Sequence, residues 1–266
     1  RRVLFRSPVV ANGQVVAGTV DARWTTVRAI RLATGTVAWK QRFRGDYPDH
    51  PVLVAPGDGV YYRVDNTRFS VGLLGGANGE RVWGLDDPPT GGWTVGGGRL
   101  YYGDRGTGAL WTYDARTGEV LWSRDVDDER LVVESFHPRF GVFATSLGTL
   151  YALDPADGTV RWTRPVPDHV ETGPAVAGGR AFVTKWGDGM DLLAFDAETG
   201  NRQWRYPLSP TGLSDGHARW WYELGVATPG VLLVVERHPR TPDALHAVDA
   251  ASGDRRWRRT LLFGPG

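Results

Sequence analysis

Apolar and polar residues alternate in short runs along this chain, and glycine-bearing turns separate the runs. The stretch Tyr151–Trp162, YALDPADGTVRW, shows the unit clearly: an alternating run, an Asp-Pro-Ala-Asp-Gly turn and a second run that ends in tryptophan. Alternation with a period of two places successive side chains on opposite faces of a β-strand. The pattern therefore predicts short β-strands joined by tight turns.

The same unit recurs six times with one fixed internal spacing. The turn glycine lies four residues before the tryptophan in each copy: Gly35 and Trp39, Gly79 and Trp83, Gly118 and Trp122, Gly158 and Trp162, Gly200 and Trp204, and Gly253 and Trp257. A period of about 40 residues built from short strands is typical of a radially repeated β architecture. Each period divides into four strands. We therefore expect an all-β protein, a β-propeller of four-stranded antiparallel blades, with six blades favoured and seven possible, in a single domain over residues 1–266.

Two kinds of connection alternate within each predicted blade. The first-to-second and third-to-fourth turns are short and carry glycine, as at Asn12–Gly13, a dipeptide typical of a tight hairpin. The second-to-third and fourth-to-first connections vary in length and composition, and Ser209–Arg219 is the longest. In an up-and-down blade these two variable connections emerge at the same end. Because binding residues concentrate on loops held by a rigid scaffold, we expect function at that end.

Composition and charge narrow the classes of function. The formal net charge of +1 gives no basic field of the kind that nucleic-acid binding requires. The chain has no cysteine, which excludes disulfides, thiolate metal sites and cysteine nucleophiles. The sequence contains no run of about 18 apolar residues, so it predicts no transmembrane helix. Since the chain starts at Arg1 and not at methionine, we expect further sequence upstream, where an anchor or another domain could stand.

The six repeat tryptophans suit a structural role. A buried indole removes roughly 150–250 Å² from water and contributes about 4–6 kcal/mol before the entropy of ordering is subtracted. Sugar stacking is the alternative, but symmetric outer-strand positions do not converge on one site. We therefore expect Trp39, Trp83, Trp122, Trp162, Trp204 and Trp257 to dock neighbouring blades together.

The repeat resembles the tryptophan-docking motif AxDxxTGxxxW of the PQQ-like β-propeller repeats. The clearest copies begin at Ala152, Ala194 and Ala247, the copy at Thr112 differs in its first residue, and the two N-terminal copies carry Arg31 and Gly75 at the aspartate position. The resemblance implies that the tryptophan stacks on the glycine peptide of the adjacent blade. It also implies an extracytoplasmic protein, because such repeats occur in outer-membrane assembly lipoproteins, kinase sensor domains and quinoprotein dehydrogenases.

Two enzyme classes compete with a binding role. A PQQ pocket, by the same resemblance, includes a vicinal disulfide and a Ca²⁺ ion, and the lack of cysteine argues against it, so we expect no cofactor. A cofactor-independent hydrolase, lyase or cyclase at the channel mouth is the stronger alternative, because a histidine beside a carboxylate can act as a general base. The letters Gly-x-Ser-x-Gly at 212–216 lie in a long link, where a nucleophile elbow does not occur. Asp188 and Asp191 offer oxygen ligands, but their spacing matches no calcium loop, and we expect no metal site.

The sequence therefore favours a non-catalytic binding or scaffold propeller that engages a protein, a peptide or a small polar ligand. Acidic and aromatic residues gather on the variable connections, which suits a cationic or polar partner. The alternative is that these carboxylates are solvated and the aromatics fill the channel mouth. The expected binding residues are Trp24, Asp49, His50, Trp93, Asp168, His169, Trp186, His217, Trp220 and Trp221.

Overall fold

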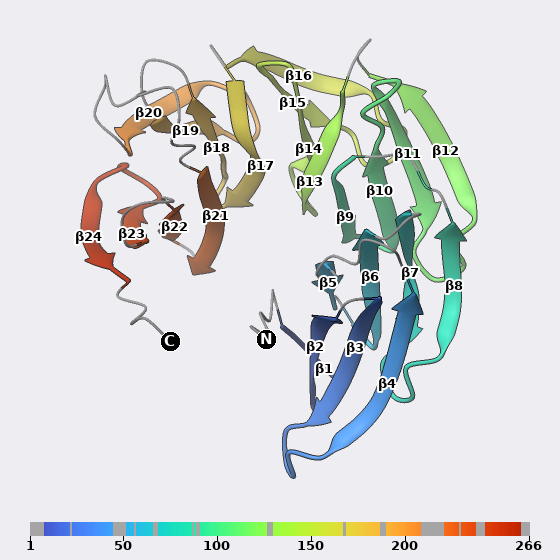
Figure 1. Ribbon diagram of the computed structural model, residues 1–266. Coiled ribbons are helices and arrows are strands. Elements are labelled where there is room, and N and C mark those ends of the chain that lie inside the picture. Colours follow the sequence, from blue (N-terminus) through green and yellow to red (C-terminus); the bar gives the residue numbers. More distant parts are fainter. Residues whose placement is uncertain are drawn as a thin grey trace. The chain divides into compact units, whose positions relative to one another are not determined.

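The structure is a computed structural model that describes residues 8–21, 23–44, 52–55, 57–65, 69–86, 88, 91–126, 130–166, 169–186, 190–208, 221–228, 230–237 and 243–261. These residues form 24 β-strands in six four-stranded sheets (Figure 1). No helix occurs in these ranges, and so none with the length and hydropathy of a membrane span. The prediction of an all-β chain with four-stranded blades is confirmed.

Each sheet is a meander of four strands that follow one another along the chain. The six sheets comprise β1 Val9–Ala11, β2 Gln14–Asp21, β3 Trp24–Arg31 and β4 Val37–Arg44; β5 Val52–Val54, β6 Gly59–Asp65, β7 Phe69–Gly75 and β8 Arg81–Asp86; β9 Trp93–Gly96, β10 Arg99–Gly103, β11 Ala109–Asp114 and β12 Val120–Asp125; β13 Val132–His137, β14 Gly141–Ser146, β15 Thr149–Leu153 and β16 Val160–Pro165; β17 His169–Ala177, β18 Arg180–Trp186, β19 Met190–Asp196 and β20 Arg202–Pro207; and β21 Trp221–Thr228, β22 Val231–Arg237, β23 Ala244–Asp249 and β24 Arg255–Thr260.

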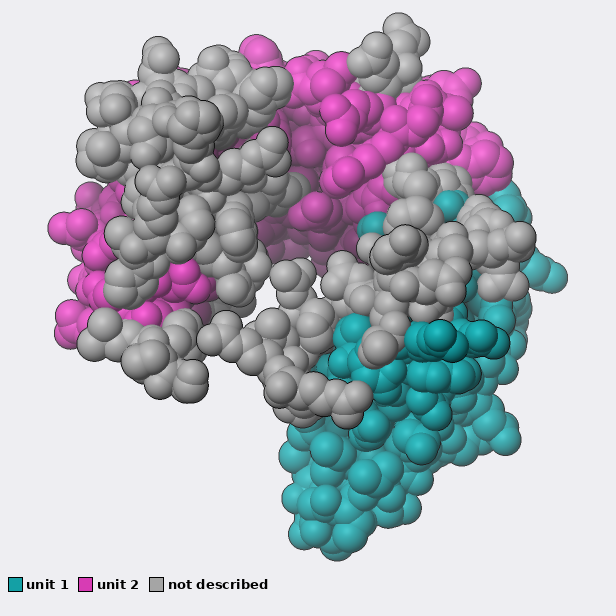
Figure 2. All heavy atoms as spheres, viewed as in Figure 1, with its two compact units in different colours: residues 1–90, 95–100, 112–121 teal, residues 91–94, 101–111, 122–266 magenta. Residues whose placement is uncertain are grey.

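The chain divides into two compact units (Figure 2). Unit 1 comprises residues 1–90, 95–100 and 112–121, and unit 2 comprises residues 91–94, 101–111 and 122–266. Unit 1 contains the sheets β1–β4 and β5–β8, whereas unit 2 contains the three sheets from β13 to β24. The sheet β9–β12 contributes residues to both units. The expectation of a single domain over residues 1–266 stays a prediction.

The three complete sheets of unit 2 share one arrangement. Their first strands lie on the same side, where β17 contacts both β13 and β21 (Figure 1). Every residue of β14 is buried, whereas every residue of the outer strand β24 is exposed. The core therefore lies in the inner strands, and one of its clusters joins Phe143 and Leu150 to Val183 and Leu193 of the next sheet.

A repeated irregularity stands opposite the repeat tryptophan in the three complete sheets of unit 2. In the sheet β13–β16, Ala152 pairs with Trp162, and the register shifts immediately afterwards, between Ala152 and Leu153. The same shift follows Ala194 opposite Trp204 and Ala247 opposite Trp257. A register shift of this kind re-aims side chains at the end of a hairpin.

The tryptophan of one sheet lies against the turn glycine of the next, as the resemblance implies. A Cβ atom on Gly200 would lie 2.7 Å from Cδ2 of Trp162, and the Trp162 indole N–H donates to the Ala197 carbonyl at 3.2 Å. Equivalent close approaches join Trp39 to Gly79, Trp83 to Gly118, Trp122 to Gly158 and Trp204 to Gly253. Each of these five indoles therefore lies against the turn glycine of the next sheet, and their role in docking the blades stays a prediction. Trp257 lies on β24 with 40% of its surface exposed, so its docking role stays a prediction.

Trp122 docks differently from the other four. Its outer ring atoms Cζ3 and Cη2 approach Gly158, whereas Trp162 and Trp204 present Cδ2 and Cε3 to their glycines. Within the described residues its indole N–H has no hydrogen-bond partner. The carbonyl at the corresponding turn position belongs to Pro155 and accepts the Tyr101 hydroxyl at 3.2 Å. The indole of Trp122 is thus displaced along its turn relative to Trp162 and Trp204.

Backbone hydrogen bonds close both ends of the sheets β13–β16 and β17–β20. At the turn end, defined by the first-to-second and third-to-fourth turns, Ala197 N donates to Gly179 O at 2.9 Å. At the loop end, defined by the other two connections, Val166 N donates to Gly148 O at 2.6 Å and Leu208 N to Met190 O at 2.8 Å. The turn end is therefore the end that docking occupies.

Candidate functional site

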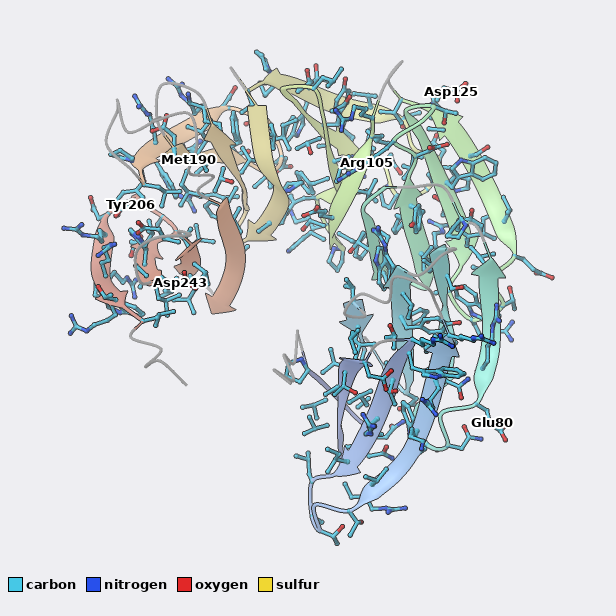
Figure 3. All side chains as sticks on the ribbon, in the orientation of Figure 1. Glu80, Arg105, Asp125, Met190, Tyr206 and Asp243 are labelled. Atoms are coloured by element: carbon cyan, nitrogen blue, oxygen red, sulfur yellow. The ribbon has the colours of Figure 1, made fainter. Side chains whose placement is uncertain are left out.

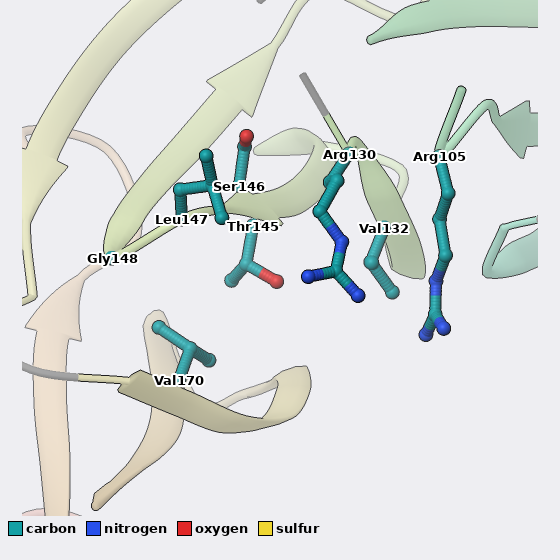
Figure 4. A pocket seen from close by; sticks show the side chains of 8 residues that line it. All are labelled: Arg105, Arg130, Val132, Thr145, Ser146, Leu147, Gly148 and Val170. Atoms are coloured by element: carbon teal, nitrogen blue, oxygen red, sulfur yellow. The ribbon is translucent and has the colours of Figure 1, made fainter. Parts of the chain in front are cut away.

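A small polar pocket opens at the loop end of the sheets in unit 2 (Figure 4). Its volume is about 180 Å³, and it is lined by Arg105, Arg130, Val132, Thr145, Ser146, Leu147, Gly148 and Val170. All of these residues belong to unit 2. The pocket lies at the end of the sheets where the variable connections predict function.

Regular strands fix one wall of this pocket. Strand β14 is buried along its length and brings Thr145 and Ser146 to its loop end, where the two-residue turn Leu147–Gly148 leads into β15. Val132 opens β13 and pairs with Thr145 across the sheet. Val170 stands one residue into β17. Three packed strands therefore hold the apolar and hydroxyl-bearing side of the pocket.

Two connections supply the arginines. The loop that carries Arg105 is shaped by Asp104, whose carboxylate accepts hydrogen bonds from Gly106 N and from the Thr107 hydroxyl, each at 2.7 Å. Leu131, the residue after Arg130, donates its N–H to the Asp104 carbonyl at 3.2 Å. The two arginine-bearing segments are therefore tied together at their backbones.

The electrostatic character of the pocket follows from these arginines. Both side chains are exposed, and neither forms an ion pair with a carboxylate of the described residues. Figure 4 shows both guanidinium groups extending in the same direction, with Val132 between them. A guanidinium presents a planar fork of N–H donors that matches a carboxylate or phosphate. The pocket is suited to an anion, whereas the sequence favoured a cationic or polar partner.

The structure describes only some of the expected binding residues. Trp93 is buried, with 8% of its surface exposed, and Trp24 is half-buried with the Arg42 guanidinium 4.2 Å from its ring centroid. The backbones of His169 and Trp186 face each other across β17 and β18, next to Val170, and Trp221 opens β21. The remaining candidates, which are Asp49, His50, Asp168, His217 and Trp220, lie outside the described residues. The assignment of these ten residues to binding stays a prediction.

Sequence reasoning missed the two arginines and the exposed leucine of the pocket. Arg105 and Arg130 are two of many arginines in the chain, and nothing in their sequence context distinguishes them. Leu147 does carry a signal, because a two-residue hairpin turn favours asparagine before glycine, as at Asn12–Gly13. Leucine at that position breaks the local rule.

Two buried ion-pair networks were also not expected. The Asp191 carboxylate is almost fully buried and lies 2.8 Å from Arg205 Nε and 3.4 Å from Lys185 Nζ. Both contacts occupy the oxygen atoms that were considered as metal ligands. Over the ranges that the structure describes, no group of three or more histidine, aspartate, glutamate or cysteine residues could hold a metal ion.

The second network joins β22, β23 and β24. Glu236 Oε2 lies 2.6 Å from His246 Nε2 and 3.0 Å from Arg258 Nη2. Tyr206 on β20, which is labelled in Figure 3, lies with its hydroxyl 3.4 Å from His246 Nδ1. Burial raises the pKa of Glu236, but the hydrogen bonds and charges of His246 and Arg258 outweigh it, and the net pKa lies below its ordinary value. The network is buried within the sheet and does not line the pocket, so we assign it to stability.

Comparison with known proteins places this chain among propellers. The family described as outer membrane protein assembly factor BamB matches residues 67–135 and 139–265, which is more than half of the chain. A BamB of Yersinia pestis is 28% identical over 237 residues, which cover 82% of this chain and 58% of the relative. A polyvinylalcohol dehydrogenase of a Sphingopyxis species is 27% identical over 238 residues, covering 77% of this chain and 34% of the relative. The chain thus spans less than two thirds of either relative.

Solved structures agree on the fold. A BamB from Moraxella catarrhalis superposes with a TM-score of 0.64 at 16% identity, covering 96% of this chain and 76% of that one. A europium-containing methanol dehydrogenase superposes with a TM-score of 0.58 at 15% identity, covering 96% of this chain and 68% of that one. At these identities the likeness shows the β-propeller fold alone.

The dehydrogenase relatives raise the question of PQQ with a metal ion. The residues present do not fit that pair, because the chain has no cysteine and its described acidic residues and histidines form no cluster that could hold a metal. The expectation of no cofactor itself stays a prediction. The docking geometry and the family match together decide the family: the chain belongs to the BamB family of PQQ-like β-propeller repeat proteins.

Proposed function

We propose that this chain is a non-catalytic binding or scaffold module that engages a protein partner through the loop end of its blades. The proposal is supported by the family and by the relative whose name states a role in outer membrane protein assembly. In keeping with that family, we place the chain in an extracytoplasmic compartment.

One observation carries this proposal: the two ends of the sheets are used differently. At the turn end, indole rings and carbonyl groups satisfy one another, as Trp162 and Trp204 do with Ala197 and Ala250. At the loop end, a pocket brings together two arginines that no carboxylate of the described residues pairs. Side chains on loops that have no partner within the chain are available to bind another protein.

Site-specific photo-crosslinking in cells of the source organism tests the proposal. A photoreactive phenylalanine is placed at Leu147, which is 60% exposed at the loop end, and in a matched variant at Glu198, whose side chain is 67% exposed at the turn end. We expect a discrete protein adduct, identified by mass spectrometry, from position 147 alone. Adducts of equal yield from both positions, or none from position 147, contradict a partner at the loop end.

A further inference from the structure

We propose that the pocket at the loop end binds the carboxylate of an acidic side chain that a protein partner presents. The inference rests on the proposed function and deepens it by naming the group that the partner inserts. Three observations support it: the charge of the pocket, the composition of its walls and the backbone conformation of two lining residues.

The charge is the first observation. Arg105 and Arg130 bring two positive charges to one small space, and no carboxylate of the described residues neutralises either. Two like charges held together cost free energy through repulsion, which an incoming anion relieves. The hydrogen bond from Leu131 N to Asp104 O ties together the two backbone segments that carry these arginines. The pocket is therefore prepared for a negative group.

The walls select the kind of anion. Leu147 and Val170 are apolar, Val132 stands between the two arginines, and Thr145 brings its hydroxyl group toward Arg130 (Figure 4). A volume of about 180 Å³ is well below the roughly 300–1,000 Å³ of sites for drug-sized ligands. It suits a short methylene stem that ends in a carboxylate, such as a glutamate side chain. A free phosphate ion would leave the apolar side without a partner.

The backbone conformation of two lining residues is the third observation. Among the described residues, three that are not glycine have positive φ, and two of them, Arg130 at 45° and Leu147 at 34°, line this pocket. Such a conformation costs about 1–3 kcal/mol and persists where the surrounding structure imposes it, often at binding sites. Leu147 is also 60% exposed, so burial in the free protein does not explain its presence. Contact with the stem of an inserted side chain does.

Nuclear magnetic resonance titration of the ¹⁵N-labelled full chain tests the inference. The probes are N-acetyl-glutamate N-methylamide, its neutral glutamine analogue and inorganic phosphate, and the observed signals are the backbone amides of Leu147, Gly148 and Val170. We expect the glutamate probe to shift these signals saturably and the glutamine analogue to leave them unchanged. Equal shifts from the glutamate and glutamine probes overturn the inference.

Three double variants identify the groups responsible. R105A/R130A removes both forks and is expected to weaken glutamate-probe binding by about tenfold or more. R105K/R130K keeps both charges, and we expect intermediate binding because lysine lacks the planar fork. The matched control R116A/R202A removes two exposed arginines from the turn end and is expected to bind like the unmodified protein. An equal loss in the control shows a general charge effect and overturns the assignment.

The source of the anion is decided in the same titration. Phosphate that shifts the same signals at lower concentration than the glutamate probe identifies a site for a free anion and overturns the acidic side chain. Failure of this inference is distinguishable from failure of the proposed function. Loss of probe binding with retained crosslinking from position 147 refutes the pocket alone, whereas probe binding without any crosslink refutes the protein partner.

Discussion

The indole of Trp204 occupies the space in which a side chain on Gly253 would begin. A Cβ atom there would lie 2.7 Å from Cδ2 of the indole, and Gly253 has a φ of 80°. The indole N–H donates to the carbonyl of Ala250, three residues before the glycine, at 3.2 Å. Glycine is thus required twice, by the backbone conformation of the turn and by the ring that lies against it.

These two requirements can be separated by substitution. Gly253→Ala introduces both the unfavourable φ and the clash with Trp204, whereas Gly178→Ala introduces only the first, because Gly178 has a φ of 55° and no atom within 4 Å of its Cβ position. We expect Gly178→Ala to cost about 1–2 kcal/mol in the free energy of unfolding and Gly253→Ala to cost more. Urea unfolding measures both. Equal losses would show that the ring moves aside without cost.

The repeat tryptophans differ in burial, and we expect the loss in the free energy of unfolding on replacement by alanine to be larger for the more buried ones. Trp162 is 9% exposed and packs against Gly200, so Trp162→Ala is expected to cost about 3–5 kcal/mol. Trp257 is 40% exposed, and Trp257→Ala should cost distinctly less. Urea unfolding of the two variants checks the order. A larger loss from Trp257→Ala than from Trp162→Ala would show that the exposed fraction of the indole does not determine its contribution to the free energy of unfolding.

Acid should destabilise the turns that carry the repeat aspartates. The hydrogen bond from Arg256, followed by those from the Ser252 and Ala251 amides, lowers the pKa of Asp249 from 3.8 to about 2. A carboxyl group whose pKa is lower in the folded state stabilises it above the unfolded pKa, and this contribution is lost as the pH falls through the folded pKa. We expect the thermal midpoint to fall between pH 3.8 and about 2.

The variant Asp249→Asn supplies the control for this acid effect. Its side chain does not ionise, so the fall in its thermal midpoint over the same window should be smaller than in the unmodified protein. Identical pH profiles for the two proteins would exclude Asp249 as a source of the acid sensitivity. Asp114 and Asp196, whose pKa values are lowered by backbone hydrogen bonds in equivalent turns, continue to contribute in both proteins.

The Glu236 network should contribute to stability and not to binding. Glu236→Gln removes the charge that faces His246 and Arg258 in a buried site, and we expect it to cost about 1–3 kcal/mol in the free energy of unfolding. Glu119→Gln, on an exposed turn, should change it by less than about 0.5 kcal/mol. Glutamate-probe binding should be unchanged in both. A loss of probe binding in the folded Glu236→Gln variant would connect the network to the pocket.

Leu147→Asn should raise stability and weaken binding. Asparagine adopts positive φ at lower cost than leucine, so we expect a gain of about 1 kcal/mol. The same change removes part of the apolar wall and should weaken the glutamate probe. Leu121→Asn, at an exposed position of strand β12, should bring no gain. A Leu147→Asn variant that binds the probe normally would remove leucine from the proposed site.

Much of the fold was predictable because its determinants are local and repeated. The spacing of glycine and tryptophan predicted the four-stranded sheets, and Trp162 lies against Gly200 and Trp204 against Gly253, as the repeat implies. The irregular docking of Trp122 was not predictable, because its copy of the repeat has the same glycine–tryptophan spacing as the regular copies. The pairing of Asp191 with Lys185 and Arg205 likewise joins three strands.

The sequence by itself determined the repeat and the glycine-bearing turn before each tryptophan, because strand alternation and turn chemistry act between near neighbours, and it predicted function at the loop end. Only the tertiary structure decided which residues meet at that end. Arg105 and Arg130 lie on two connections and Val170 lies on β17, and their convergence with Thr145 follows from how the sheets pack and not from any spacing along the chain. The sign of the pocket charge was therefore decided by packing.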